Sequence, residues 1–338
     1  MESSRARRRR CARPSRRRPL LYTALVSVAI VGGTAAGTVY VKAKAHTGTS
    51  AVSSSVSPSA TSSPSADGEA SVEAVAEPTV DREQLLADAL ASVTVPDGAK
   101  VSAAVLDLES GESATYGDAA FDTASIVKVD ILATLLLQAQ DAGRRLTAAE
   151  KTYATAMIEN SDNTSASALW RIIGKADGLD AANERFGLTD TAGGDDMLWG
   201  LTQTTAADQL TLLQQVFGDD SKLSEASQSY LRGLMKQIET DQHWGVSAAA
   251  DGSAWALKNG WLARSTTGLW DINSIGRVTV DGHDYLVSVL SNGNATQTKG
   301  ISLVEAAARA ALSAFTGGDG SASASAAARA TASATTSG

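Results

Sequence analysis

Ser125 and Lys128 lie three residues apart at the start of a strongly apolar segment. In a helix this spacing places both side chains on one face, one turn apart. A serine hydroxyl becomes an effective nucleophile when a base takes its proton, and a lysine can act as that base once burial and a second cation lower its pKa. The pair could therefore catalyse acyl transfer. A Ser-x-x-Lys spacing alone is expected by chance about once in a chain of this length, so this interpretation needs further motifs.

Two further motifs carry polar groups that acyl transfer can use. A Ser-Asp-Asn motif at 161–163 follows the helix-like segment 148–159, and a Lys-Asn-Gly motif at 258–260 stands at the end of a segment with strand character. Each motif occurs once in the chain. A serine at the start of a helix also lies near free backbone N–H groups and the positive end of the helix dipole, which would stabilise an oxyanion. Together the motifs favour a serine acyl-transfer site.

The order of these motifs, and the elements that carry them, resemble the class A β-lactamase and penicillin-binding protein family over about residues 81–317. The resemblance implies that Ser125 is the acylated nucleophile and that Lys128 is its base or proton shuttle. It also implies that Ser161 donates a proton to the leaving nitrogen. The chemistry of this family needs no metal and no cofactor, and we expect none.

The resemblance further implies how a substrate would be held. Asn163 would contact the substrate side chain and Lys128. Lys258 would place positive charge near the second motif and attract the carboxylate of a β-lactam or of a D-alanyl peptide from the peptidoglycan stem. The backbone N–H groups of Ser125 and Trp261 would form the oxyanion hole, so that Trp261 contributes only its backbone.

Three departures from the family pattern bear on activity. Asn259, before Gly260 in the lysine motif, replaces the usual Thr or Ser, and we expect its amide to donate to the substrate carboxylate. The stretch between the first two motifs is short, which predicts a more open cleft. In residues 164–257 we find no Arg-x-x-Glu loop with the glutamate that activates the deacylating water. Asp195 or Asp196 lies at a suitable distance in the sequence, but a preceding glycine pair favours an exposed turn.

These features predict a β-lactamase-like serine hydrolase that forms an acyl-enzyme with β-lactams or D-alanyl peptides and deacylates slowly. Such a protein would belong to β-lactam catabolism and the antibiotic response. The alternative is a catalytically idle, membrane-tethered ectodomain that binds cell-wall peptide or a protein partner. The replacement at Asn259, the short loop and a long tether motivate this alternative.

Other polar side chains favour a structural interpretation. His46, His243 and His283 stand in unrelated contexts, so a Ser-His-Asp triad or a histidine metal site would need an unusual convergence. Arg264 and Arg277 could each anchor a substrate carboxylate, although an exposed arginine is the simpler interpretation. Four tryptophans are interpreted as core residues or as the rim of the cleft, namely Trp199, Trp244, Trp255 and Trp261.

The surrounding pattern predicts the elements that position these residues. Leu86, Leu90 and Val93 recur at helical spacing, and residues 126–140 are apolar nearly all round, as in a helix at the centre of a domain. Residues 122–245 are mostly helical, and the expected strands and final helix are 101–108, 113–116, 254–257, 270–280, 285–290 and 303–315. The fold class is therefore α/β and class A β-lactamase-like. An antiparallel sheet is flanked by N- and C-terminal helices, and an all-α lobe shares its cleft.

The N-terminus predicts a membrane anchor. Residues 1–18 hold nine Arg against one Glu, and residues 20–41 form an uncharged run long enough to span a bilayer as a helix. By the positive-inside rule the later residues lie outside the cytoplasm. A cleavage site after Ala45 would instead make the run a signal peptide and the protein secreted. We favour a single-pass protein of the cell membrane.

Composition sets the remaining boundaries. We expect an arginine-rich cytoplasmic region at 1–18, the transmembrane signal anchor or signal peptide at 19–42, a disordered Ser/Ala/Pro linker at 43–80, the hydrolase domain at 81–317 and a disordered tail at 318–338. The whole chain carries a net charge of −8 and residues 1–18 carry +8, so the remainder carries about −16. This acidic body argues against a nucleic-acid partner. The single cysteine, Cys11, precedes the apolar run, which excludes thiolate chemistry and disulfides from the exported part.

Overall fold

A computed structural model describes residues 80–317 of the chain. The expected anchor at 19–42, nearly all of the expected linker and the expected tail at 318–338 lie outside the described residues. Within the described part, no helix has both the length and the apolar character that a membrane crossing demands.

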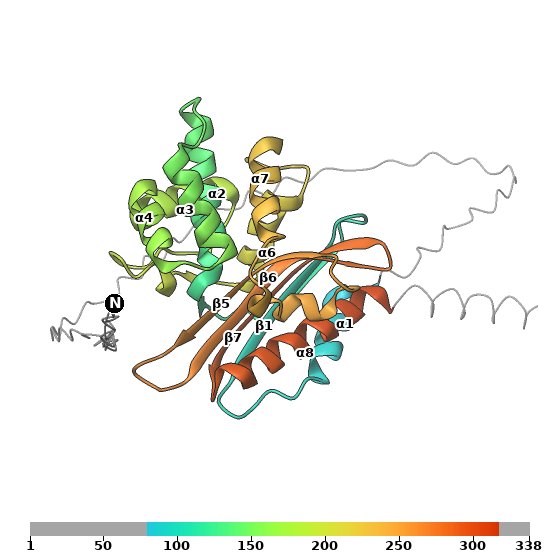
Figure 1. Ribbon diagram of the computed structural model, residues 1–338. Coiled ribbons are helices and arrows are strands. Elements are labelled where there is room, and N and C mark those ends of the chain that lie inside the picture. Colours follow the sequence, from blue (N-terminus) through green and yellow to red (C-terminus); the bar gives the residue numbers. More distant parts are fainter. Residues whose placement is uncertain (1–79, 318–338) are drawn as a thin grey trace, which may run out of the picture. The chain divides into compact units, whose positions relative to one another are not determined.

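The centre of the fold is a five-stranded antiparallel sheet with the strand order β2-β1-β7-β6-β5. Its strands are β1 (Lys100–Asp107), β2 (Ser113–Tyr116), β5 (Trp255–Ala263), β6 (Trp270–Val280) and β7 (His283–Asn294). The terminal helices α1 (Arg82–Ala91) and α8 (Gln297–Thr316) pack together on one face of this sheet (Figure 1). β5 forms an edge, which leaves one side of its backbone free to meet other parts of the molecule.

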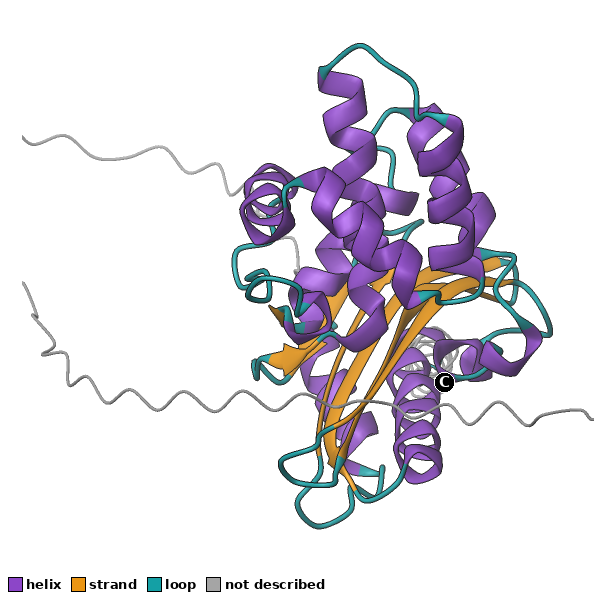
Figure 2. Cartoon of the chain, turned by 60° about the vertical axis from the view of Figure 1, so that its left-hand side comes forward, coloured by secondary structure: helices purple, strands orange, loops and turns teal. Residues whose placement is uncertain are grey.

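The strands are apolar on both faces because both faces are covered. Successive residues of a strand point to opposite sides of a sheet. In β7, Val287 and Val289 belong to the hydrophobic cluster formed with α1 and α8, whereas Leu286 and Leu290 belong to the cluster under the helical lobe. The sheet is therefore sandwiched between the terminal helices and the lobe (Figure 2).

The helical lobe contains α2 (Val127–Asp141), α3 (Ala148–Glu159), α4 (Asn163–Ile173), α5 (Lys175–Phe186), α6 (Ala206–Phe217) and α7 (Glu225–Met235). α2 is buried along almost its whole length. Thr147 and Glu150 form a capping box at the start of α3, and Asp162 caps α4 by accepting a hydrogen bond from Ser165 N at 2.6 Å. α4 ends at Gly174, whose φ of 97° suits glycine.

The remaining elements of the fold are short. A two-residue strand, β3 (Phe121–Asp122), pairs with β4 (Gln203–Thr204). Four short 3₁₀ turns are η1 (Ala124–Ile126), η2 (Trp199–Leu201), η3 (Thr240–Gln242) and η4 (Gly245–Ala249).

The structure confirms the class A β-lactamase-like arrangement of sheet and helices, corrects two boundaries and adds one pair of strands. β5 continues to Ala263, so the lysine motif lies inside a strand rather than at its end. α8 starts at Gln297 rather than Leu303, because Thr296 caps a polar first turn that carries no apolar period. The β3–β4 ribbon was not expected, since strands of two residues are too short to show an alternation.

Candidate active site

Ser125 lies in the turn η1, directly before α2, and is partly buried. The preceding residue, Ala124, has a φ of 48°, a left-handed conformation that is unfavourable for a residue with a side chain. The rest of the protein holds this turn in place. Thr123 N donates to Thr202 O at 2.9 Å, and Asn273 Nδ2 donates to the carbonyl oxygens of Asp122 and Thr123 at 2.9 and 3.0 Å.

Lys128 lies in the first turn of α2 and is completely buried. Its Nζ donates hydrogen bonds to Ser161 O at 2.6 Å, to Ser161 Oγ at 3.0 Å and to Asn163 Oδ1 at 2.8 Å. Burial lowers the pKa of Lys128 to about 7, against the opposing effect of nearby Asp162. The amine can therefore release and accept a proton near neutral pH, which a general base must do.

Ser161 joins the two lysines. Its backbone adopts a φ of 54° at the turn between α3 and α4. Its Oγ accepts from Lys128 Nζ and also from Lys258 Nζ at 3.2 Å, so its own hydroxyl hydrogen remains available to a third group. Lys258 also donates to Gln242 Oε1 at 3.3 Å and to Asn259 O at 3.0 Å. Burial, together with the charge of Lys128, lowers the pKa of Lys258 well below its usual value.

The alternation of β5 separates the lysine motif into two faces. Lys258 points to Ser161. Gly260 brings the strand so close to residues 123–126, here called the nucleophile turn for the role expected of Ser125, that an added Cβ would lie 2.8 Å from Ser125 N. Trp261 points to the other side, where its ring lies 6.1 Å from that of Trp244. Because β5 is an edge strand, alternate N–H groups of its backbone face away from β6.

Asn259 does not have the role expected from the sequence. It is completely buried on the face opposite Lys258, and its Nδ2 donates to Gln242 O at 2.8 Å and to Trp244 O at 3.1 Å. Both amide hydrogens are therefore engaged with the backbone. The expectation that this amide donates to a substrate carboxylate is wrong in this structure. Asn259 instead fastens β5 to the segment that carries Gln242.

Three further residues contact the predicted site. The ring of Trp199 lies over Lys128, with Nζ 5.1 Å from the ring centroid, and Trp199 Nε1 donates to Ser167 Oγ at 3.1 Å. Gln242 contacts Lys258, and Asn273 holds the nucleophile turn. A polar Asn273 within an apolar strand was a signal in the sequence, whereas Gln242 and Trp199 reach the site only through the tertiary structure.

Most of the other Asp, Arg and His side chains considered in the sequence analysis form contacts with groups other than the two lysines and Ser161. Asp196 is exposed and pairs with Lys175 at 2.6 Å, and Arg277 pairs with Asp284 at 2.8 Å. His243 contacts the carbonyl oxygen of Ile238, His283 pairs with Glu109, and Arg264 pairs with Asp122 and Asp271. Asp195 is exposed, and His46 lies outside the described residues. Residues 80–317 contain no group of three or more His, Cys, Asp and Glu arranged to hold a metal ion.

Comparison with solved structures identifies the fold. A mutant of PBP-A, solved as an acyl-enzyme complex with penicillin G, is 22% identical, covers 69% of this chain and 96% of its own, and has a TM-score of 0.59. The TLA-1 extended-spectrum β-lactamase is 15% identical, with coverages of 69% and 98% and a TM-score of 0.60. A class A β-lactamase from Bacteroides cellulosilyticus is 15% identical, with coverages of 70% and 99% and a TM-score of 0.61.

Comparison of sequences identifies the family. No curated protein matches the chain. The model of the β-lactamase enzyme family matches residues 142–315, a range that includes Ser161, Asn163 and Lys258 and begins after Ser125. This match spans more than half of the chain, and the fold agrees with it. The chain therefore belongs to the β-lactamase enzyme family.

Proposed function

We propose that this protein is a serine hydrolase that forms an acyl-enzyme at Ser125 with β-lactams or D-alanyl peptides. One observation carries the proposal. Two buried lysines both donate to the hydroxyl oxygen of Ser161, next to the turn that presents Ser125. A buried, hydrogen-bonded cluster of this kind is costly to assemble for stability alone, because two cations are desolvated together.

The acylation step follows from these contacts. Neutral Lys128 takes the proton of Ser125 Oγ while that oxygen bonds to the carbonyl carbon of the substrate. The carbonyl electrons move to its oxygen and return as the C–N bond breaks. The nitrogen then takes the hydroxyl proton of Ser161, and protonated Lys128 replaces that proton through its hydrogen bond to Ser161 Oγ. The step leaves an ester at Ser125, a protonated leaving nitrogen and a neutral Lys128.

One charged side chain and two backbone N–H groups complete the proposed site. In the protonated form, Lys258 attracts the carboxylate that β-lactams and peptide C-termini share. The backbone N–H groups of Ser125 and Trp261 would stabilise the oxyanion, because Gly260 lets β5 approach the nucleophile turn. A structural neighbour, a mutant of PBP-A, was solved as an acyl-enzyme complex with penicillin G, which supports the same reaction here.

We further propose that deacylation is slow. Hydrolysis of the ester needs a base that activates water. Asp195 and Asp196 are exposed, and Asp196 is paired with Lys175. Trp199 covers Lys128 with an apolar ring. This arrangement favours an enzyme that is acylated readily and turns over slowly.

Labelled penicillin tests the proposal. The protein incubated with it should carry the label on Ser125, as located by peptide mass spectrometry, and Ser125→Ala should carry none. Absence of any adduct at high concentration would refute the proposal. If Ser125→Ala also kept full affinity for stem peptides, the idle binding ectodomain would be the better description. Hydrolysis of a chromogenic cephalosporin at rates on the order of tens per second would contradict slow deacylation.

A further inference from the structure

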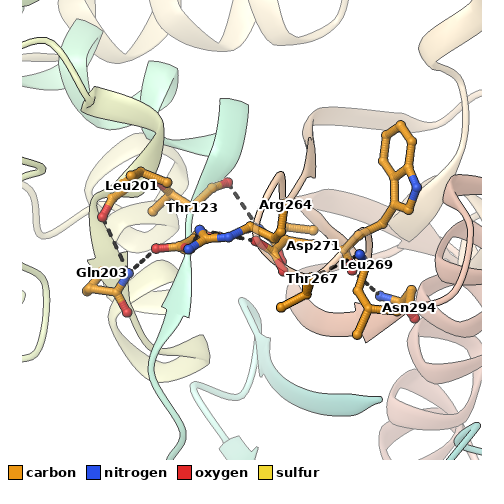
Figure 3. Close-up of polar contacts among 11 residues, drawn as sticks. Thr123, Leu201, Gln203, Arg264, Thr267, Leu269, Asp271 and Asn294 are labelled. Atoms are coloured by element: carbon orange, nitrogen blue, oxygen red, sulfur yellow. Dashed lines mark hydrogen bonds and ion pairs between the residues drawn. The ribbon is translucent and has the colours of Figure 1, made fainter. Parts of the chain in front are cut away.

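Asp122 lies three residues before Ser125 and forms an ion-pair network behind the nucleophile turn. Its carboxylate contacts Arg264 Nη1 and accepts a hydrogen bond from Gln203 Nε2. Figure 3 shows Arg264 between Gln203 and Asp271, next to Thr123. The side chain of Asp122 is only 13% exposed, so this ion pair is poorly screened by water.

The network joins segments that are far apart in the sequence. Asp122 belongs to β3, which leads into the nucleophile turn, and Gln203 belongs to β4, directly after the turn that carries Trp199. Arg264 follows the last residue of β5, three residues beyond Trp261. Both N–H donors proposed for the oxyanion therefore lie within three residues of this ion pair, on opposite sides of it.

A second carboxylate fixes the position of the arginine. Asp271 on β6 lies 3.6 Å from Arg264 Nη1 and is nearly buried. Arg264 N also donates to Leu269 O at 2.8 Å within the β5–β6 hairpin. The arginine is thus anchored to its own hairpin, and its contact with Asp122 is the ionic link from that hairpin to the nucleophile turn.

The nucleophile turn needs such a link because its backbone is strained. Ala124, between Asp122 and Ser125, has a left-handed φ of 48°, which persists only where surrounding contacts enforce it. Asn273 on β6 donates hydrogen bonds to the carbonyl oxygens of Asp122 and Thr123, and Arg264 forms an ion pair with the side chain of Asp122. Both restraints come from the β5–β6 hairpin.

We propose that Asp122 and Arg264 are positioning residues whose ion pair holds the backbone N–H of Ser125 in register with that of Trp261, so that the oxyanion hole is formed before substrate binds. The proposal rests on the acylation chemistry proposed above. It predicts that these residues help to stabilise the transition state and do not change the affinity for substrate, because an oxyanion hole acts on charge that develops during the reaction.

The test compares Asp122→Asn, Arg264→Gln and their double variant with a matched control, Asp284→Asn. Asp284 forms an ion pair with Arg277 at 2.8 Å on the same sheet, near the β6–β7 hairpin. Acylation by a fluorescent penicillin is followed at increasing concentration, which separates the affinity before acylation from the rate of the acyl transfer. Hydrogen exchange of the backbone amides at 123–126 is measured on the same proteins without penicillin.

Each single variant should slow acyl transfer about 10- to 100-fold with little change in the affinity before acylation. The double variant should be no slower than either single variant, because the two residues act through one contact. Exchange at 123–126 should accelerate in both single variants and stay unchanged in Asp284→Asn, which should also keep its acylation rate.

Two results of the acylation measurement would overturn the proposal. The first is normal acyl transfer in Asp122→Asn. The second is an equal loss in Asp284→Asn, which would mean that the network serves stability alone. If the unmodified protein forms no adduct, the proposed function fails, and the exchange measurement alone then tests the positioning role of the ion pair. Unchanged exchange at 123–126 in Asp122→Asn would reject its positioning role, and selective acceleration would support it.

Discussion

In the proposed reaction, the reactivity of Ser125 depends on the protonation of two buried lysines that share one acceptor. Lys128 and Lys258 both donate to Ser161 Oγ, and neither is exposed to solvent. Burial lowers the pKa of both groups, and the charge of Lys128 lowers the pKa of Lys258 further. In the proposed acylation, the neutral amine of Lys128 acts as the base, whereas Lys258 must keep its proton in order to attract a carboxylate.

This state predicts a pH dependence for acylation. Below a pH of about 7, Lys128 is protonated and cannot accept the proton of Ser125; above it, the amine is neutral. The rate of acyl transfer should therefore rise with pH through about 7 and then level off. Stopped-flow labelling with a fluorescent penicillin between about pH 5 and 8 measures this rise.

The matched variants for this profile are Lys128→Ala and Lys151→Ala. Loss of the base at Lys128 should slow acylation about 10²- to 10⁴-fold above a pH of about 7 and remove the rise with pH, so that the difference from the unmodified protein shrinks at low pH. Lys151 is exposed on α3, so its variant should reproduce the original profile. A flat profile in the unmodified protein would show that Lys128 is not the group that titrates.

At the scale of elements, the contact between β5 and the nucleophile turn depends on one glycine. A Cβ added to Gly260 would lie 2.7 Å from Thr123 O, 2.8 Å from Ser125 N and 2.9 Å from Ile126 N. All three are backbone atoms, so the strand or the turn would have to move. Gly260→Ala should lower the rate of acyl transfer about 10²-fold or more, as expected when an oxyanion donor is displaced.

Gly233 provides the control for this prediction. It lies in α7, and a Cβ at this position would meet nothing within 4 Å. Gly233→Ala should leave acylation unchanged and should raise the free energy of unfolding by about 1 kcal/mol, because alanine is the better helix former. Normal acylation in Gly260→Ala would mean that the turn and β5 do not form the oxyanion hole together.

The periodic elements could be predicted from the sequence, and the contacts between them could not. Helices with strong apolar periods and the strands 101–108, 270–280 and 285–290 lie within two residues of their expected bounds or inside the observed elements. The strand that carries Lys258 was expected to end there because three polar or small residues interrupt its apolar pattern. Each interruption has a tertiary cause: Lys258 meets Ser161, Asn259 meets Gln242, and Gly260 meets the nucleophile turn.

For the candidate site, too, the motifs could be predicted from the sequence, but the contacts between distant segments could not. Ser125, Lys128, Ser161 and Lys258 stand in recognisable motifs, and the structure brings the last three together through hydrogen bonds. No motif indicated which face of a strand meets the cleft at residue 259, since the alternation has no fixed phase until neighbouring strands are placed. The ion pair of Asp122 was equally hidden, because its partner is supplied by a hairpin more than a hundred residues away.

For the whole molecule, one buried carboxyl group in α2 links stability to pH. Asp130 is 1% exposed, and burial raises its pKa to about 7, with Asp180 and Asp208 acting in the same direction. Its polar neighbours Asn183 and Thr134 only partly offset this effect. In the unfolded chain the group titrates near 3.8, so between about pH 4 and 7 folding requires proton uptake.

Since the folded state holds more protons in this range, the contribution of Asp130 to stability is complete at low pH and is lost as the pH rises, at about 1.4 kcal/mol per pH unit. Asp130→Asn should therefore stabilise the protein at pH 7.5 and change little at pH 4.5, as measured by urea unfolding. Asp219→Asn, at an exposed position, should not change the slope. An unchanged slope in Asp130→Asn would contradict the prediction.

The proposed location of the molecule rests on the sequence of residues outside the described part. We propose that the arginine-rich residues 1–18 and the uncharged run at 20–41 anchor the chain in the cell membrane, with the hydrolase domain outside the cytoplasm. A substrate in the cell wall would then be within reach.

Fractionation of intact cells tests this arrangement. The full chain should remain with the membranes after carbonate extraction, and a membrane-impermeant labelled penicillin should modify Ser125 without lysis. A variant lacking residues 19–42 should stay in the cytosol and react only after lysis, which controls for folding of the domain. Release of the intact domain into the medium, with a new N-terminus after Ala45, would show that the run is a cleaved signal peptide. Labelling that requires lysis of cells carrying the full chain would place the domain in the cytoplasm and reject the proposed topology.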